Sequence, residues 1–212
     1  MVDNSIACKS IIMRCDQIEE SAFLELSSEV EIEFYKTGME AVWVQVQKSA
    51  GEFVEESDEQ VKAYFMQKYG CKLAELEKRC IFLKDICTGK YIGTCMAWFE
   101  TKGDKVVPVL HWLAVADEYS GRGYARMLIT QVMLLFDKYA TVESIYLHTQ
   151  PWSYRAIKLY NDFGFCMSRN DVYGTAVNEY EEAMQILERC MSEETYEKRF
   201  TNAKFRVLGL LK

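Results

Sequence analysis

The longest continuous pattern in the chain covers residues 107–139. Residues 109–116 are apolar and β-prone at odd and even positions alike, which is typical of a central strand buried on both faces. Residues 117–120 interrupt the pattern, and a turn containing Gly121 and Gly123 follows. Apolar residues then recur at steps of three and four, at Ala125, Leu128, Ile129, Val132, Leu135, Phe136 and Tyr139. The pattern predicts a strand, a glycine-rich turn and an amphipathic helix.

Before this stretch, the pattern predicts a strand, two helices and a hairpin. Residues 30–35 alternate apolar and acidic positions, as in a half-exposed strand. Residues 37–40 and 57–60 each have the spacing of a capping box, so each is expected to begin a helix. Residues 79–85 and 90–100 are expected to pair around Thr88-Gly89 and to continue through Gly103-Asp104 into the central strand. Three antiparallel strands therefore follow one another.

After the amphipathic helix, the chain predicts a strand at residues 144–149, a helix at 153–160 and a short strand at 166–170. Residues 180–191 carry apolar side chains on one face and charged ones on the other, and we expect the acidic stretch 179–182 to be a solvated face. We expect this last helix to pack against the domain, with a homodimer contact as the alternative. The apolar tail, residues 200–212, suits either a last strand or a segment that docks on a partner.

The length and composition fit one globular domain with appendages. The chain has 212 residues, of which 50% are hydrophobic. We divide it into an N-terminal extension (1–28), a main domain (29–175) and a C-terminal helix and tail (176–212). Within the extension, residues 11–13 are apolar enough to add an edge strand.

Charge and hydropathy exclude several classes of protein. The net charge of −7 argues against nucleic acid as the main partner, and it is compatible with an amine substrate. No apolar run approaches the roughly eighteen residues needed to span a membrane, and residues 1–15 lack the core of a signal peptide. We expect a cytoplasmic protein that does not bind membranes.

The cysteines do not indicate a metal site. Eight cysteines are scattered without a C-x-x-C pair, and the chain has only two histidines. Buried free thiols in a reducing compartment are the expected state, and no metal is predicted.

The turn between the central strand and the following helix is a candidate phosphate site. The first N–H groups of a helix lack partners within it, and the helix dipole places positive charge behind them. Glycine leaves the backbone open to an anion, and Arg122 and Arg126 add charge. The alternative is an ordinary strand-to-helix turn. A dinucleotide fingerprint would need glycine at Arg126, and a P-loop would need Ser or Thr at Tyr91.

Two motifs in this order resemble the GNAT superfamily of N-acetyltransferases. Residues 120–125, Ser-Gly-Arg-Gly-Tyr-Ala, are similar to its acyl-CoA signature Q/R-x-x-G-x-G/A, with Ser120 at the Q/R position. Residues 153–160, followed by Gly164-Phe165, resemble its second motif N-x-x-A-x-x-L-Y, with Ser153 where Asn is usual. The resemblance covers residues 30–170.

This resemblance implies a fold and a cosubstrate. The fold class is α/β, with a mixed but mostly antiparallel central sheet, helices on both faces and an added C-terminal helix. The cosubstrate is acetyl-CoA, and the acceptor is a primary amine of a small molecule or peptide. The implied cosubstrate-binding residues are Leu113, Ala114, Val115, Ser120, Gly121, Arg122, Gly123, Tyr124, Ala125, Ser153 and Ala156.

The implied reaction is direct attack of the amine on the thioester. Tyr160 matches the family's general acid, since a phenol stays protonated at neutral pH and can donate to the departing thiolate. An aromatic core residue is the alternative for Tyr160. Glu100 and His111 are the candidate bases, and His148 is weaker. Because His111 alternates with Leu110 and Trp112, we expect it to face the opposite side from those two.

Two other functions remain open. Ser120 and Ser153 depart from the family's usual residues, so the chain could be an inactive acyl-CoA-binding module. A cysteine acyltransferase working through an acyl-enzyme would need Cys95 and His111 to converge with a carboxylate. Trp98, Trp112 and Trp152 are candidate walls of an acceptor pocket, and the sequence does not name the acceptor.

Overall fold

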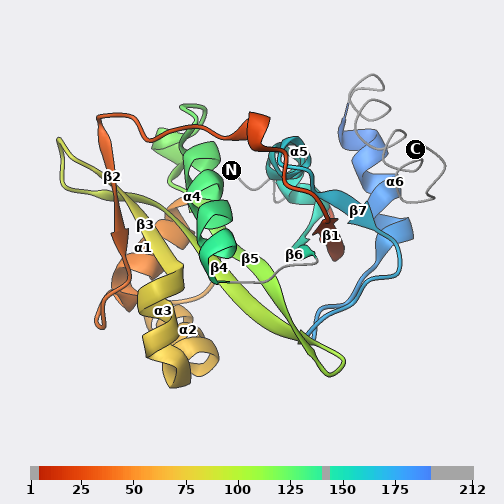
Figure 1. Ribbon diagram of the computed structural model, residues 1–212, viewed down its shortest axis with the longest axis horizontal. Helices are drawn as coiled ribbons and strands as arrows, with labels where there is room; N and C mark the ends of the chain where they lie inside the picture. The colour runs from red at the N-terminus through yellow and green to blue at the C-terminus, as the bar shows by residue number, and fades with distance from the viewer. Residues whose placement is uncertain (1–4, 140–143, 192–212) are drawn as a thin grey trace. The chain divides into compact units, whose positions relative to one another are not determined.

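A computed structural model of the chain describes residues 5–139 and 144–191. Its strands form one mixed sheet of seven, in the order β2-β3-β4-β5-β6-β1-β7 (Figure 1). The strands are β1 (Ile11–Cys15), β2 (Val30–Phe34), β3 (Cys80–Asp85), β4 (Tyr91–Lys102), β5 (Lys105–Val115), β6 (Ile145–Thr149) and β7 (Cys166–Ser168). The α-helices are α1 (Glu40–Ser49), α2 (Asp58–Tyr69), α3 (Leu73–Arg79), α4 (Tyr124–Tyr139), α5 (Tyr154–Asp162) and α6 (Tyr180–Cys190). The predicted α/β class is confirmed.

The described residues divide into two compact units. The first holds residues 23–98 and 110–139, and the second holds residues 5–22, 99–109 and 144–191. The tail, residues 200–212, lies outside the described residues, so its two interpretations stay predictions.

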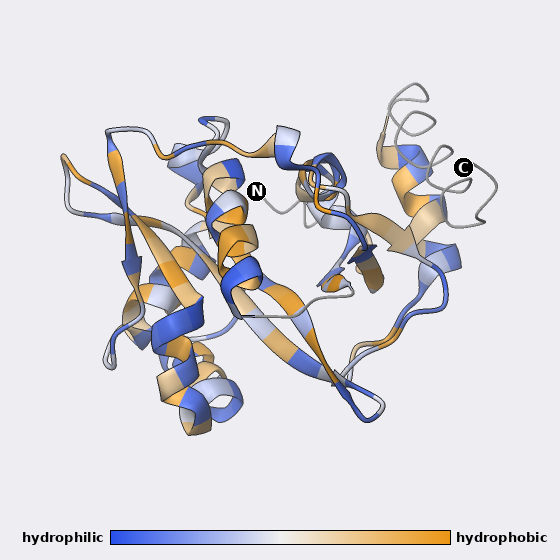
Figure 2. Cartoon of the chain, viewed as in Figure 1, coloured by the Kyte–Doolittle hydropathy of each residue, from blue (hydrophilic) through white to orange (hydrophobic). Residues whose placement is uncertain are grey.

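In the first unit, helices cover both faces of the strands. Cys80 and Phe82 of β3 belong to a buried cluster with side chains from α1, α2 and α3. The opposite face meets α4 at Gly93 of β4, where an added Cβ would lie 2.8 Å from a methyl carbon of Leu128. Gly93 therefore lets α4 approach the sheet closely. Figure 2 shows α2 and α3 striped with hydrophilic and hydrophobic residues, as expected of helices with one buried face.

Two helices of the first unit differ in how they begin. Ser57 caps α2 with a complete capping box to Gln60, as predicted. The capping box predicted at residues 37–40 is wrong, because α1 has no side-chain cap. The Glu40 carboxylate instead accepts hydrogen bonds from the hydroxyl of buried Tyr35 and from the Gly38 N–H. A buried hydroxyl needs a partner, and this need outweighs a local cap.

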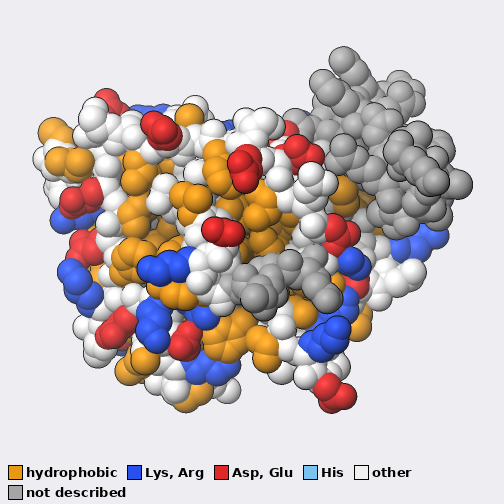
Figure 3. Space-filling view, in the orientation of Figure 1, with side chains coloured by type: hydrophobic (Ala, Val, Ile, Leu, Met, Phe, Trp, Pro, Cys, Tyr) orange, Lys and Arg blue, Asp and Glu red, His pale blue; other side chains and the backbone are white. Residues whose placement is uncertain are grey.

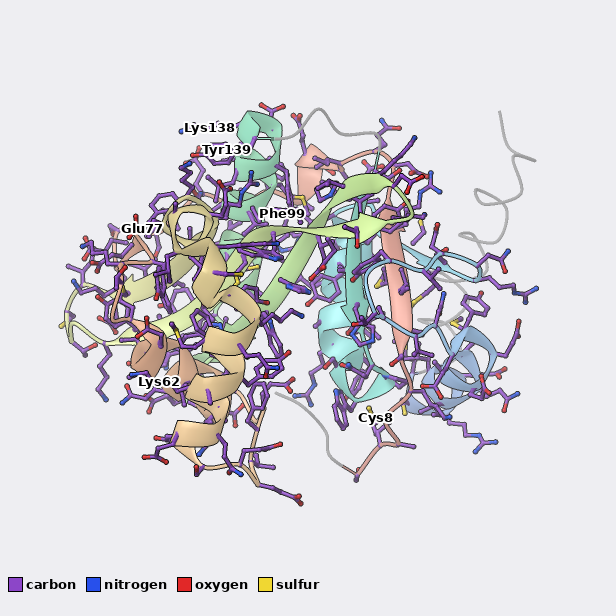
Figure 4. All side chains as sticks on the ribbon, turned by 90° about the horizontal axis from the view of Figure 1, so that it is seen from below. Cys8, Lys62, Glu77, Phe99, Lys138 and Tyr139 are labelled. Carbon is purple, nitrogen blue, oxygen red and sulfur yellow. The ribbon has the colours of Figure 1, made fainter. Side chains whose placement is uncertain are left out.

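The helix α3 was not predicted from the sequence, and it braces the end of α4. The Arg79 guanidinium lies 5.1 Å from the centre of the Tyr139 ring, which Figure 4 labels in the last turn of α4. Glu75 accepts a hydrogen bond from Arg79 at 2.7 Å, and this bond lowers the pKa of the Glu75 carboxyl. Glu77, also labelled in Figure 4, accepts from the Thr37 hydroxyl at 3.4 Å.

In the second unit, β1 is an interior strand. It pairs antiparallel with β6 on one side and with β7 on the other, and Ile11, Ile12 and Met13 are fully buried. The expectation of an edge strand at residues 11–13 is therefore wrong. A run of consecutive apolar residues is typical of a strand covered on both faces.

The last helix packs within the second unit. Ala183 and Leu187 are fully buried. Just before α6, Glu179 accepts a hydrogen bond from Lys9 at 2.6 Å and from the Ser10 N–H at 2.9 Å. Glu179 thus joins the helix start to the residues before β1, instead of lying on a solvated acidic face. The homodimer alternative stays a prediction.

Candidate functional site

The glycine turn in the first unit has the backbone geometry that an anion site needs. Gly121 and Gly123 have φ values of +80° and +84°, a region that residues with a Cβ rarely adopt. Among residues 5–139 and 144–191, no acceptor is found for the N–H groups of Gly121 to Ala125. The N–H of Ser120 donates to the Asp117 carbonyl at 3.0 Å. Five amides at the start of α4 are therefore open, and that of Ser120 is not.

The turn is held from the segment before β2. The N–H of Leu24 donates to the Thr130 hydroxyl at 3.0 Å, and the Tyr124 hydroxyl donates to Glu29 at 3.4 Å. An added Cβ at Gly123 would lie 3.1 Å from a methyl carbon of Leu24. These contacts fix the first turns of α4, so its open amides keep one direction.

Arg122 places positive charge beside this turn. Its side chain is exposed, its guanidinium lies 5.3 Å from the centre of the Tyr119 ring, and it donates to the Glu118 carbonyl at 3.4 Å. On the face drawn in Figure 3, acidic and basic side chains are interspersed rather than separated by sign. Anion binding at the turn therefore depends on local groups, because the net charge of −7 opposes it.

His111 and Trp112 lie on the same side of β5. The indole N–H of Trp112 donates to the Tyr69 hydroxyl at 2.7 Å, and this hydroxyl lies 3.0 Å from Nδ1 of His111. The expectation that the two side chains lie on opposite faces is therefore wrong. Trp112 has a φ of +53°, which breaks the strand alternation. Gln47, which is buried, donates to the Trp112 carbonyl at 3.2 Å and supports this conformation.

The hydrogen bonds around Tyr69 bear on the chemistry of His111. An indole N–H can only donate, so the Tyr69 oxygen is the acceptor of the Trp112 bond. Tyr69 is fully buried, and Nδ1 of His111 is placed to accept its hydroxyl proton. Where the Tyr69 hydroxyl donates to Nδ1, a neutral His111 carries its proton on Nε2. Nε2 can accept a proton from an amine only if Nδ1 is protonated and the Tyr69 hydroxyl turns away.

Tyr69 is not among the candidate residues predicted from the sequence. Its position was readable in part, since Val61, Phe65 and Tyr69 recur every four residues along α2. A tyrosine on the buried face of a helix needs a partner for its hydroxyl. The identity of that partner depends on how α2 packs against β5, which periodicity does not reveal.

Residues 113–115 of β5 lie where the sheet packs against α1 and α4. Ala114 is buried and belongs to a cluster with Val46 and Ala50 at the end of α1. Leu113 and Val115 are half-buried, and Val115 lies near Gly93, on the face that meets α4. Residues 113–115, for which the resemblance implies a backbone role, therefore lie on a strand that is packed on both faces.

In the second unit, Tyr160 lies on α5 and is 7% exposed. Its ring packs edge-on against Phe165 at 6.1 Å between centres. Its carbonyl accepts from the N–H groups of Phe163 and Phe165, each at 3.1 Å, across a turn in which Gly164 has a φ of +96°. Both parts of the Gly-Phe end of the motif therefore hold Tyr160 in place.

Ser153 and Ala156 are half-buried at the start of α5. The N–H of Ser153 donates to the Gln150 carbonyl at 3.0 Å, and its side chain does not cap the helix. The hydroxyl of Ser153 thus has no capping task in α5.

Glu100 is half-buried in the second unit, beside a segment that covers it. An added Cβ at Gly174 would lie 3.3 Å from the Glu100 carboxylate, and the Gly174 N–H donates to the Thr101 carbonyl at 2.6 Å. Burial and, secondarily, the negative charge of Glu100 raise the pKa of Tyr173. His148 is half-buried on β6, opposite Ile12 of β1. The predicted residues thus form two sets, with residues 111–125 in one unit and Glu100, Ser153, Ala156 and Tyr160 in the other.

The cysteine considered as a nucleophile is inaccessible. All eight cysteines are free; Cys8, Cys71 and Cys87 are exposed, whereas Cys95 is fully buried. Burial strongly raises the pKa of the Cys95 thiol, and it raises that of Cys80 to about 12. A thiol in this state is a poor nucleophile, which argues against an acyl-enzyme on Cys95.

Residues 5–139 and 144–191 contain no cluster of three or more His, Cys, Asp or Glu side chains suited to a metal ion. Nor do they include a helix whose length and hydrophobicity would let it cross a membrane.

Comparisons with known proteins show the family and the fold of the chain. The model of the acetyltransferase (GNAT) family matches residues 40–165, more than half of the chain. A GCN5-related N-acetyltransferase from Sphaerobacter thermophilus has a TM-score of 0.55 at 16% identity, over 77% of this chain and 49% of that one. A GNAT-family acetyltransferase from Colwellia psychrerythraea has a TM-score of 0.55 at 13% identity, over 77% and 54%. No curated protein matches the sequence.

A third solved structure is similar over nearly its whole length. The aminoglycoside N-acetyltransferase AAC(6')-Iy, solved in complex with CoA, has a TM-score of 0.52 at 16% identity, over 71% of this chain and 96% of that one. The chain spans about half the length of the Sphaerobacter and Colwellia proteins. At these identities, the three structures show a shared fold and nothing more.

Proposed function

Because the chain belongs to the acetyltransferase (GNAT) family, we propose that it transfers the acetyl group of acetyl-CoA directly to a primary amine of a small molecule or peptide. The observation that carries this proposal is the row of open N–H groups from Gly121 to Ala125. Unpaired amides at a helix start bind phosphate, and CoA carries a pyrophosphate. The similar fold of a CoA-bound acetyltransferase also supports it.

The proposed reaction assigns a task to each set of residues. The five amides hold the pyrophosphate, and the backbone of residues 113–115 receives the acyl arm. The amine nitrogen forms a bond to the acetyl carbon while the carbon–sulfur bond breaks. Tyr160 donates its phenolic proton to the departing sulfur. The ammonium formed on nitrogen gives up a proton to Glu100, to His111 or to water.

The role of Tyr160 is tested by following CoA release with a panel of primary amines. Tyr160→Phe should lower turnover by at least about a hundredfold while the affinity for acetyl-CoA is retained, which is the usual share of a general acid. Tyr154→Phe, six residues earlier at the start of α5, is the matched control and should keep its turnover. Unchanged turnover in Tyr160→Phe would remove Tyr160 from the reaction.

The glycine turn is tested separately by calorimetric titration with acetyl-CoA. Gly121→Val forces a β-branched residue toward φ +80° and should turn the amides away, abolishing binding. Gly89→Val is the matched control, because Gly89 also has positive φ (+70°) and open space around it. Equal acetyl-CoA affinity in wild type and Gly121→Val would rule out the turn as the phosphate site.

The same two assays distinguish the proposed enzyme from the alternative, an inactive binding module. An inactive acyl-CoA-binding module would bind acetyl-CoA and would lose this binding in Gly121→Val. It would not release CoA with any amine of the panel. The substitutions of the usual motif residues by Ser120 and Ser153 are the observation that favours this alternative.

A further inference from the structure

The left-handed backbone at Trp112 brings three polar side chains of the first unit together. Trp112 has a φ of +53°, which a bulky residue adopts only where its surroundings impose it, most often at a functional site. The rings of Trp43 and Phe53 hold the indole in this position, at 5.3 and 5.5 Å between ring centres. As a result, His111 and Trp112, which are neighbours in sequence, both reach the hydroxyl of Tyr69.

The Tyr69 hydroxyl has a fixed place. Tyr69 is fully buried, and its ring packs edge-on against Trp98 at 4.8 Å between ring centres. Two ammonium groups lie beside these rings: Lys68 is 5.8 Å from the centre of the Tyr69 ring, and Lys72 is 5.8 Å from that of Trp98. Positive charges oppose a further one nearby, so these surroundings favour an uncharged imidazole at His111.

The two hydrogen bonds at this hydroxyl have coupled directions. The indole N–H of Trp112 can only donate, so the Tyr69 oxygen accepts it at 2.7 Å. A hydroxyl whose oxygen accepts a hydrogen bond becomes a stronger donor through its own proton, because successive bonds polarise one another. Nδ1 of His111 lies 3.0 Å from the same oxygen. The coupling favours a chain of bonds that runs from Trp112 through Tyr69 to His111.

This chain determines what His111 can do in a reaction. With Nδ1 accepting from Tyr69, a neutral His111 carries its proton on Nε2, so Nε2 donates and cannot take a proton from an amine. His111 precedes Leu113 by two residues, so their Cα atoms are at most about 7 Å apart. In the proposed function, the acyl arm lies along residues 113–115. A donor at this place suits the acetyl carbonyl oxygen, where negative charge develops when nitrogen attacks.

Resting on the proposed function, we propose that Tyr69 is a positioning residue and that His111, which it orients, donates from Nε2 to the acetyl carbonyl oxygen. The amine nitrogen bonds to the acetyl carbon, and the oxygen becomes negative. The N–H of His111 stabilises this charge until the carbon–sulfur bond breaks. Tyr160 gives its proton to the sulfur, and the ammonium proton passes to Glu100 or to water instead of to His111.

Turnover of His111 variants distinguishes a donor from a base. Glutamine carries an amide N–H that can replace the Nε2 donor and an oxygen that can accept from Tyr69, but an amide is not a base. His111→Leu should lower kcat by about a hundredfold or more, the usual cost of losing one such donor. His111→Gln should turn over at least about tenfold faster than His111→Leu.

Variants of α2 test the positioning role. Tyr69→Phe should lower kcat by a smaller factor than His111→Leu and should retain the affinity for acetyl-CoA. Tyr64→Phe removes a hydroxyl from the same helix and is the matched control, which should match wild type in kcat.

The proton on His111 is read independently of turnover by nitrogen–proton correlation spectra of protein labelled with ¹⁵N-histidine, at neutral pH. The chain has only two histidines, so the signals that disappear in His111→Gln belong to His111. Wild type and Tyr64→Phe should show the Nε2–H tautomer alone. Tyr69→Phe should add a population of the Nδ1–H tautomer or of imidazolium, a change that a merely structural role of Tyr69 would not produce.

Three results overturn this inference and leave the proposed acetyl transfer standing. They are an Nδ1–H tautomer or imidazolium of His111 in wild type, equal turnover of His111→Gln and His111→Leu, and a Tyr69→Phe protein that matches wild type in spectrum and kcat. If wild type releases CoA with no amine, its spectra with acetyl-CoA and with CoA decide. A shift of the Nε2 signal that only acetyl-CoA causes would support the donor while the proposed reaction fails. Equal spectra with both would overturn both.

Discussion

Gly164→Ala should destabilise the protein through two separable effects. Gly164 has a φ of +96°, and an added Cβ would lie 2.3 Å from the Gln17 carbonyl oxygen. The left-handed backbone costs alanine about 1–2 kcal/mol. The clash with a backbone atom costs about 1–3 kcal/mol more, because a carbonyl cannot rotate away as a flexible side chain can. The expected loss of stability is thus about 2–5 kcal/mol.

Gly38→Ala is the matched control for the first effect. Gly38 has a φ of +101°, and an added Cβ there meets no atom within 4 Å. Its substitution should cost the conformational part alone, about 1–2 kcal/mol. The difference between the two variants isolates the contact between Gly164 and Gln17.

The measurement is thermal unfolding followed by circular dichroism. For a chain of this size, each kcal/mol lowers Tm by about 2–4 °C. Gly164→Ala should therefore melt about 2–12 °C below Gly38→Ala. Equal melting temperatures would show that the chain accommodates the added methyl group, and the reasoning from the close approach at Gln17 would be refuted.

Two shorter predictions concern charge and sulfur. Burial works against ionisation of Asp171, yet hydrogen bonds from Lys102 and Ser168 hold its pKa below the usual range. The pair of Lys102 and Asp171 therefore stabilises the fold above about pH 4, and this stabilisation is lost as the pH falls. In thermal melts, Lys102→Met should lie furthest below wild type near pH 7, and the gap should close toward pH 3; a constant gap would contradict this assignment. Cys95→Ala should retain full turnover in the CoA-release assay, because direct transfer needs no thiol of the protein and that of Cys95 is fully buried. Loss of turnover in a folded Cys95→Ala protein would revive the acyl-enzyme.

The regular elements of the chain were predictable because their signals are local. The helix α4 and its glycine turn follow from a periodicity and two glycines within a few residues of each other. The capping box at Ser57 is equally local, and it is present in the structure. The family match confirms the resemblance to the GNAT family. That resemblance rested on two short motifs, each confined to a helix and the turn beside it.

Other features depended on contacts between distant parts of the chain. The interior place of β1 depends on β6 and β7, which follow more than a hundred residues later. The Glu40 carboxylate had the spacing of a cap, but the buried hydroxyl of Tyr35 lies within its reach and needs a partner. Periodicity carries no information about which strand or hydroxyl will be the neighbour.

The candidate chemistry divides in the same way. The sequence by itself determined the glycine turn before α4, because glycine at positions 121 and 123 permits the backbone angles that open the amides. Only the tertiary structure decided that His111 and Trp112 share the hydroxyl of Tyr69 and that Phe53 meets Trp112. The physical reason is the left-handed backbone at Trp112, which contacts from α1 and α2 sustain and which no strand pattern encodes.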